Sequence, residues 1–236
     1  MAVRLLFPTF LFEVDLLNDE LHPQDGVTQE YLHLLKETMD GMRQKDPKGR
    51  RISNAYTGWQ SNDGCESNPA FAQLIKKIQR VFQREVIPFH GLNPVKATMQ
   101  MGNAWANIND FGAWNKPHLH NGCWYSGAFY IHAEGDEGNI DIIDKDCKVV
   151  ADFPHSNRTP TSHSIQPTSG KLVLFPSGTM HMVEPNLSDK ERYSIAFNIE
   201  MRYSGGIESR MPINGDTYNP DEFKFEIDTK GDPILK

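Results

Sequence analysis

The sequence predicts a mainly β protein with flanking helices, whose strands form a jelly roll. The chain of 236 residues contains 15 Pro and 18 Gly, a content that favours many turns over long helices. A part with helical periodicity precedes a strand-rich part, and the change falls near residues 88–94. From Val95 onward the hydrophobic period is two, and seven short segments have the composition of strands, which is typical of a jelly roll.

The first part of the chain contains two predicted helices that cover one face of the sheet. In the first, over residues 27–44, apolar residues recur at steps of three and four: Val27, Tyr31, Leu34, Leu35, Met39 and Met42. The second begins after Asn68, which can cap it, and Pro69 suits its first turn. We expect this helix to end at Pro88.

The predicted strands occupy residues 95–101, 124–132, 139–144, 148–153, 171–175, 181–184 and 192–203. A chain of this length suits one domain. We therefore expect a single domain over 1–203, with helical support over 1–94 and a β core over 95–203. The remainder, 204–236, is rich in Gly, Pro, Asp and Asn, and we interpret it as a C-terminal tail or lid.

Charge and apolar patterning exclude two classes of partner. A formal net charge of −7 is unlike the basic surface that a duplex requires, so we expect no nucleic-acid partner. The apolar run from Arg4 to Phe12 is broken by Pro8 and is too short for a membrane span, so we interpret it as an entry strand and expect no membrane attachment.

The cysteine content favours a reducing compartment. Cys65, Cys123 and Cys147 are an odd number, lie far apart and form no Cys-x-x-Cys pair, so neither a disulfide framework nor a thiolate zinc site is indicated. We therefore predict a cytoplasmic protein. Cys123 lies near a histidine motif, but we interpret it as a small buried hydrophobic residue rather than as a reactive thiol.

Three histidines form a candidate metal site. His118 and His120 are two residues apart, so on an extended backbone their imidazoles point to the same side. His181 follows a predicted strand and a Pro-Ser-Gly turn, which would return it to the same mouth of the barrel. Three ligands on one face leave positions open, as in non-haem Fe(II) oxygenases, and zinc is the alternative ion.

The predicted strand at 192–203 supplies a candidate carboxylate site. Arg192 and Ser194 project to the same side, opposite an apolar face, and a guanidinium beside a hydroxyl suits a carboxylate. The alternative is the solvated face of an edge strand, with Arg192 paired to Glu191 or Asp189. With the histidines only 11 residues upstream, we favour the carboxylate site.

At this point the sequence resembles the 2-oxoglutarate/Fe(II) oxygenase superfamily and is closest to a poorly characterised family within it. The resemblance covers residues 4–203. Its motifs follow one another in this order: Leu6-Phe7-Pro8-Thr9, Trp59-Gln60-Ser61, His118-x-His120, Ser126-Gly127-Ala128-Phe129-Tyr130, Leu174-Phe175-Pro176-Ser177, His181, Arg192-x-Ser194 and Phe197-Asn198.

The resemblance implies a cupin-like double-stranded β-helix that uses Fe(II), 2-oxoglutarate as co-substrate and O2. It implies that His118, His120 and His181 bind the metal, and that Arg192 and Ser194 bind the distal carboxylate of 2-oxoglutarate. The three histidines and Arg192 are then the catalytic set. Two further candidates for the co-substrate site are Tyr130, whose alternative is a place in the core, and Asn198, with Asn107 as a weaker pocket candidate.

One position departs from the superfamily, because His120 stands where a carboxylate is usual. A third imidazole leaves the site one negative charge short, which can alter metal preference. The alternative third ligands are Asp110, Glu134 and Asp136. We assign no catalytic role to His132, His155 and His163, nor to Trp105, Trp114 and Trp124.

The function implied is that of a dioxygenase that hydroxylates an unidentified prime substrate and converts 2-oxoglutarate to succinate. The substrate is either a small molecule or a peptide or protein side chain, and a homodimer is left open. There are two alternatives, a three-histidine iron dioxygenase that does not use 2-oxoglutarate, and a non-catalytic metal-binding or ligand-binding jelly-roll module.

Overall fold

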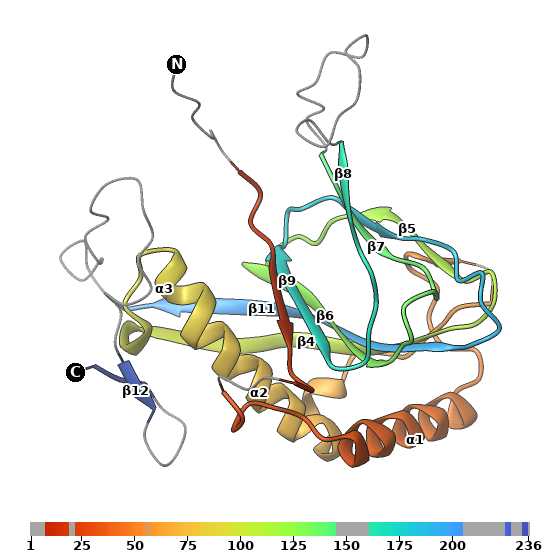
Figure 1. Cartoon of the computed structure of the whole chain (residues 1–236), viewed down its shortest axis with the longest axis horizontal. Helices are drawn as coiled ribbons and strands as arrows, with labels where there is room; N and C mark the ends of the chain where they lie inside the picture. Colours follow the sequence, from red (N-terminus) through yellow and green to blue (C-terminus); the bar gives the residue numbers. More distant parts are fainter. Residues whose placement is uncertain are drawn as a thin grey trace, which may run out of the picture.

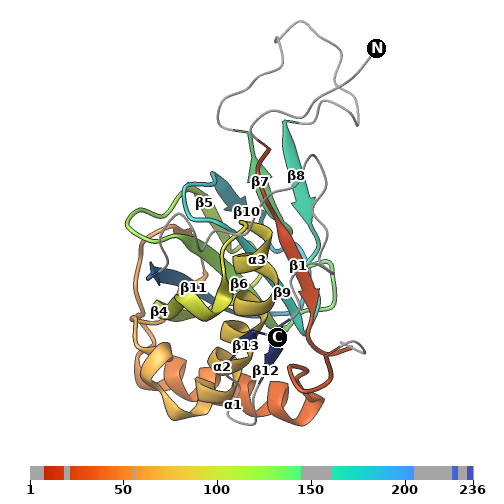
Figure 2. The same cartoon turned by 90° about the vertical axis from the view of Figure 1, so that its left-hand side faces the viewer.

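A computed structural model describes residues 8–18, 22–55, 57–144, 161–204, 225–227 and 233–235. Its core is a pair of antiparallel sheets, so the predicted mainly β fold, a double-stranded β-helix, is confirmed (Figures 1 and 2). The larger sheet has the order β1-β9-β6-β11-β4-β3 and the smaller the order β2-β5-β10-β7-β8. Residues 225–227 and 233–235 form a separate two-stranded pair, β12 and β13.

The strand bounds agree with most of the predicted segments. The larger sheet consists of β1 (Phe12–Asp15), β9 (Lys171–Pro176), β6 (Tyr125–His132), β11 (Arg192–Tyr203), β4 (Ala97–Asn109) and β3 (Trp59–Gln60). The smaller consists of β2 (Asn54–Ala55), β5 (Trp114–His118), β10 (His181–Val183), β7 (Ile140–Ile143) and β8 (Ser162–Ile165). The predicted strand at 148–153 lies outside the described residues, as do Leu6, Phe7, Cys147, His155 and most of the predicted tail.

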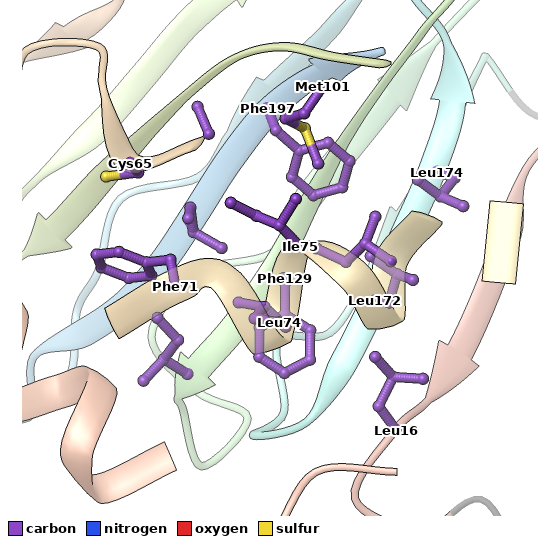
Figure 3. Close-up of a cluster of buried hydrophobic side chains, with 14 of the residues drawn as sticks. Leu16, Cys65, Phe71, Leu74, Ile75, Met101, Phe129, Leu172, Leu174 and Phe197 are labelled. Carbon is purple, nitrogen blue, oxygen red and sulfur yellow. The ribbon is translucent and has the colours of Figure 1, made fainter. Parts of the chain in front are cut away.

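Two helices cover the outer face of the larger sheet, as predicted. Helix α1 spans Gln29–Lys45, and the Thr28 side chain caps it by accepting from the Tyr31 amide. On this helix Leu32 is buried, whereas the predicted Leu34 is half exposed. Helix α2 spans Ala72–Val81 and follows a 3₁₀ turn at Pro69–Phe71 that Asn68 caps as expected. Figure 3 shows Leu74 and Ile75 of α2 packed near Phe129, Phe197 and Leu172 of the sheet.

The prediction that the second helix ends at Pro88 is wrong. A π-helical turn at Phe82–Val86 follows α2, and a last helical turn, α3 (Ile87–Phe89), contains Pro88. Proline normally breaks a helix because it lacks an N–H group and its ring meets the carbonyl four residues earlier. The wider π turn immediately before Pro88 changes which carbonyls face the ring, so the chain continues to Phe89 before it turns.

A bulge in β4 separates two environments along one strand. The pairing with β11 steps from Asn198–Asn103 to Ile199–Met101, so Gly102 is the extra residue. Before the bulge, Ala97, Met99 and Met101 face the helices. After it the odd-numbered residues of β4 turn to the interior of the barrel, and Trp105, Asn107 and Asn109 line its cavity.

Among the described residues, no helix is long and apolar enough to cross a membrane. Two of the cysteines are described and both have free thiols. Cys65 is buried in the core, and burial raises the pKa of its thiol to about 11. Cys123 is partly exposed rather than buried as predicted, because it lies in the loop between His120 and β6.

Candidate active site

Strand pairing in the smaller sheet brings the three predicted histidines together. His181 begins β10 and lies opposite His118, the last residue of β5. His120 follows two residues later, and the ring centroids of His118 and His181 are 4.3 Å apart. One ligand atom from each of the three histidines lies within 4.8 Å of the others. The side chains therefore form a cluster that can hold one ion.

Hydrogen bonds fix the tautomer of the two histidines on the strands. The Nδ1 atom of His118 is 2.6 Å from the Lys116 carbonyl oxygen, and the Nδ1 atom of His181 is 2.9 Å from the Thr179 carbonyl oxygen. A carbonyl oxygen only accepts, so each Nδ1 carries the proton and donates it. The lone pair then lies on Nε2, which is the arrangement of a metal-ligating histidine with a supporting acceptor.

Burial keeps the cluster in the form that binds metal. It lowers the pKa of His118 and of His120, and burial together with the two neighbouring imidazoles lowers the pKa of His181 to about 3. All three imidazoles are therefore neutral near pH 7. Three neutral nitrogen donors suit Fe(II) as well as zinc, so the residues fit a first-row divalent ion.

The alternative third ligands lie elsewhere. Asp110 is 3.3 Å from Nη1 of Arg43, and Glu134 pairs with Lys190. Within the described part of the chain, the only cluster of three or more His, Cys, Asp or Glu side chains suited to a metal consists of the three histidines, so Asp136 is not part of it either. The structure thus offers His120 as the third donor, in the place where the superfamily usually has a carboxylate.

A cavity inside the barrel joins the histidine cluster to the predicted carboxylate site; we call it the inner cavity. Both sheets line it, and its wall includes the three histidines, Trp105, Asn107, Tyr130, Phe175, Arg192 and Ser194. Arg192, Ser194 and Ala196 alternate along β11 and face the cavity. The alternation that predicted a shared side for Arg192 and Ser194 is therefore observed.

Arg192 is buried, and among the described residues it has no acidic partner. Its side chain is 2% exposed, and Nη1 donates to the carbonyl oxygens of Glu137 and Gly138 at 2.8 and 2.5 Å. Its Nε atom is buried and has no hydrogen-bond partner in the part of the chain that the structure describes. The alternative pairing with Glu191 is wrong, because Glu191 is bound by Arg43 instead. A buried guanidinium with a free donor fits an anion that enters the cavity.

Tyr130 lies beside the predicted carboxylate site. It is opposite Ser194 across the β6–β11 pair and is 2% exposed. Burial raises the pKa of Tyr130 to about 12, so its hydroxyl stays protonated and can donate. Tyr130 also belongs to the buried cluster with Ile140 and Phe175 between the sheets, so its predicted place in the core is observed, and its contact with the co-substrate stays a prediction.

A second depression, which we call the outer groove, opens beside the histidine cluster. It shares Ser53, Trp105, His118 and His120 with the inner cavity. Its other lining residues are Arg50, Ile52, Gln60, Asp63, Asn103, Lys116, Pro117, Leu119 and Asn198. Gln60 is 2% exposed, and its buried Oε1 atom has no hydrogen-bond partner within the described segments. Gln60 is part of the motif Trp59-Gln60-Ser61, but the sequence did not predict that it lines a groove beside the histidines.

Asn198 does not line the inner cavity, although the sequence made it a candidate for the co-substrate site. It lines the outer groove instead, and its Oδ1 atom is 2.6 Å from Nδ1 of His120.

Glu137 is a second residue whose role the sequence did not predict. Its buried carboxylate accepts from the amides of Glu134 and Gly135 at 2.8 and 3.0 Å and so holds the turn whose carbonyls orient Arg192.

Comparison with known proteins gives one family match. Residues 103–198 match the model of a family described as "Putative 2OG-Fe(II) oxygenase", and this span contains the three histidines and Arg192. No protein with a curated description of function matches the chain.

Three solved structures share the fold. A Trichoplax adhaerens prolyl hydroxylase, in complex with a hypoxia inducible factor peptide fragment, has 12% identity and a TM-score of 0.54, covering 80% of this chain and 83% of that one. Streptomyces hygroscopicus HygX, with nickel, 2-oxoglutarate and hygromycin B bound, has 11% identity and a TM-score of 0.52, covering 92% and 96%. A Pseudomonas putida prolyl-4-hydroxylase has 17% identity and a TM-score of 0.50, covering 83% and 93%.

At these identities the structural likeness is evidence of fold only, whereas the family match spans the residues of the site. The three histidines, the buried Arg192 and the double-stranded β-helix coincide in one chain. Over residues 103–198, which contain this site, the chain is similar to the 2-oxoglutarate/Fe(II) oxygenases.

Proposed function

We propose that this protein is an Fe(II)- and 2-oxoglutarate-dependent dioxygenase that hydroxylates a C–H bond of a prime substrate. The observation that carries the proposal is the inner cavity, in which three neutral imidazoles and a buried, partly unpartnered guanidinium line the same space. His118, His120 and His181 would hold Fe(II) through Nε2. When bound, the metal and co-substrate supply the oxidation, in which O2 converts 2-oxoglutarate to succinate and CO2 and one oxygen atom enters the substrate.

The protein's own residues bind and orient the co-substrate. Arg192 would take the distal carboxylate of 2-oxoglutarate, because its charge is buried and its Nε donor is free. Ser194 and the protonated hydroxyl of Tyr130 would donate to the same carboxylate. Phe175, packed 4.7 Å from the His181 ring, helps to exclude water from the metal cluster.

The outer groove is our candidate for the prime-substrate site. The volume of the inner cavity is ≈ 60 Å³, whereas that of the outer groove is ≈ 460 Å³. Since His118 and His120 line both, a molecule in the groove lies beside the metal cluster. Gln60 and Trp105 offer a hydrogen-bonding amide and an aromatic face there. Two fold neighbours were solved with hygromycin B and with a peptide fragment, and both small molecules and peptide side chains are candidate substrates here.

The test is whether the protein forms succinate from 2-oxoglutarate without a prime substrate, which requires no knowledge of that substrate. Purified protein would be incubated with Fe(II), 2-oxoglutarate and air, and succinate measured by mass spectrometry. We expect succinate from the wild type and from Arg202→Ala, an exposed arginine on the same strand, and none from Arg192→Ala. Failure of the wild type both to bind 2-oxoglutarate and to form succinate would contradict the proposal.

One observation favours a second candidate, a three-histidine iron dioxygenase that binds its substrate directly to the metal. The described residues provide no carboxylate ligand beside the histidines. Under this alternative, oxygen consumption would not depend on 2-oxoglutarate. A non-catalytic metal-binding module, the third alternative, would bind Fe(II) and consume no oxygen with any co-substrate.

A further inference from the structure

His120 differs from the other two histidines in what holds it. His118 and His181 lie on paired strands and donate from Nδ1 to backbone carbonyls. His120 lies beyond the end of β5, where its amide donates to the Ser177 carbonyl oxygen at 2.9 Å. Its Nδ1 atom instead meets two side chains, Oδ1 of Asn198 at 2.6 Å and Oγ of Ser126 at 2.9 Å. The orientation of His120 therefore depends on side chains from the opposite sheet.

Asn198 is itself held on both sides. It lies opposite Ser126 of β6 and opposite Asn103 of β4, so the three residues form a row across neighbouring strands. The Asn198 Nδ2 atom donates to Oδ1 of Asn103 at 2.8 Å, and Oδ1 accepts from Ser126 Oγ at 2.7 Å. Ser126 is fully buried, and its hydroxyl is 3.0 Å from that of Ser177. The amide of Asn198 cannot rotate without breaking these bonds.

We propose that Asn198 is a positioning residue for the metal site, an inference that rests on the metal-binding part of the proposed function. Its amide oxygen accepts the Nδ1 proton of His120 and thereby keeps the lone pair of this ring on Nε2. The same bond fixes the rotation of the His120 ring, which lies beyond the end of β5 and is not held by strand pairing. Asn198 thus supports His120 with a neutral amide, as the backbone carbonyls support His118 and His181.

Two features argue against a direct role for Asn198 with the co-substrate. It does not line the inner cavity, where Arg192 and Ser194 lie. Both ends of its amide are already engaged, with His120 and Ser126 at the oxygen and Asn103 at the nitrogen. A residue so placed acts on 2-oxoglutarate only through the metal ligand it holds.

The test is the affinity of the purified full chain for Co(II), followed by its visible absorption and by calorimetry. We expect Asn198→Ala to bind Co(II) roughly 10- to 100-fold more weakly than the wild type, the range typical for loss of a partner behind a metal-bound histidine. Asn198→Asp restores an acceptor and should bind at least as tightly as the wild type. Asn62→Ala, which removes an exposed amide 3.4 Å from Asp46, is the control and should leave the affinity unchanged.

Ser126 could take over the Nδ1 proton in Asn198→Ala, so the double variant with Ser126→Ala is measured as well. If both the single and the double variant bind Co(II) within threefold of the wild type, the inference is overturned. It is also overturned if Asn198→Asp is folded, as judged by circular dichroism, and yet binds Co(II) as weakly as Asn198→Ala. If the wild type itself does not bind Co(II), the proposed metal site fails instead.

A second measurement separates positioning from co-substrate binding. At saturating Co(II), the 2-oxoglutarate affinity of Asn198→Ala should remain within about twofold of the wild type. A large loss of 2-oxoglutarate affinity with unchanged Co(II) affinity would overturn the inference and assign Asn198 to the co-substrate site. Unfolding of the metal-free variants by heat shows whether any loss of Co(II) affinity merely follows a loss of stability.

Discussion

The guanidinium of Arg192 donates to the main-chain carbonyl oxygen of Glu137, 2.8 Å away, and to no carboxylate of the residues that the structure describes. A carboxylate partner would neutralise the arginine and compete with an incoming anion, whereas a carbonyl oxygen orients the side chain and leaves its charge available. The carboxylate of Glu137 meanwhile binds the amides of its own turn. The turn thus keeps the arginine in place for a ligand.

Arg192→Ala should weaken 2-oxoglutarate binding by about 100-fold and leave Co(II) binding unchanged. Hydrogen bonds to a charged group contribute about 1.5–3 kcal/mol, and each 1.4 kcal/mol is about tenfold in affinity. Arg192→Lys keeps the charge but loses the planar fork, so we expect an intermediate loss. Calorimetric titration with 2-oxoglutarate checks this. An unchanged dissociation constant in Arg192→Ala, with the exposed Arg202→Ala as control, would place the carboxylate site elsewhere.

Gly138→Ala should impair both stability and co-substrate binding. Gly138 has φ +87°, and a Cβ atom there would meet the carbonyl oxygens of Glu184 and, at 2.9 Å, Pro185. We expect a loss of at least about 1 kcal/mol in the free energy of unfolding and weaker 2-oxoglutarate binding, because the Gly138 carbonyl also holds Arg192. Denaturant unfolding measures the free energy of unfolding.

The control for this change is Gly41→Ala, because Gly41 lies within α1 and, apart from the neighbouring backbone of this helix, no described atom lies within 4 Å of the added methyl group. Alanine is a better helix former, so this variant should be about 0.5–1 kcal/mol more stable than the wild type. Equal stability of Gly138→Ala and the wild type would show that the turn adapts without cost.

His181→Ala should reduce metal affinity more than the roughly 10- to 100-fold that follows loss of a supporting partner, because it removes a ligand atom outright. His163→Ala, which changes an exposed histidine on β8, should bind one ion per chain like the wild type. Metal content after dialysis distinguishes the two. Retention of one tightly bound ion by His181→Ala would mean that the ion is held by other residues.

The acid stability of the protein should depend on Glu191, which joins β11 to α1. Burial raises the pKa of Glu191, but hydrogen bonds from Arg43 at 2.8 Å and Tyr193 at 2.5 Å outweigh it and lower the pKa to about 2. A lowered pKa means that the unfolded chain binds the proton first, so this contribution is present above about pH 4.5 and is lost as the pH falls towards 2.

Glu191→Gln should therefore lower stability at neutral pH and flatten the decline of the melting temperature below pH 4.5. Glu200→Gln, at an exposed position of β11, should keep the wild-type profile. Melting temperatures between pH 7 and pH 3 check this. Parallel profiles for Glu191→Gln and the wild type would contradict the assigned role of Glu191.

Side-chain periodicity predicted most of the fold and the main members of the site. The alternation in 192–203 predicted both β11 and the shared face of Arg192 and Ser194, and the two-residue spacing predicted that His118 and His120 could meet. These features depend on local geometry, which a single segment of sequence contains. The continuation of the helix past Pro88 was not predicted, since a π turn leaves no clear pattern in side-chain chemistry.

What the sequence could not provide depends on partners from distant strands. Asn198 supports His120 because β4, β6 and β11 align, and that register is not visible in any one strand. Glu137 orients Arg192 through its carbonyl group, which every residue possesses. Gly102, which directly follows the predicted strand at 95–101, was a signal for the bulge that redirects β4.

The bulge at Gly102 makes one pair of long strands serve two independent purposes. On one side of it, Met99 and Met101 belong to the layer that stabilises the protein, and on the other, Asn103, Trp105 and Asn107 face the cavities where ligands would bind. Substitutions at these three positions therefore leave the hydrophobic layer intact. In such a scaffold, substrate preference can diverge by changes of single side chains while the stability of the fold is conserved.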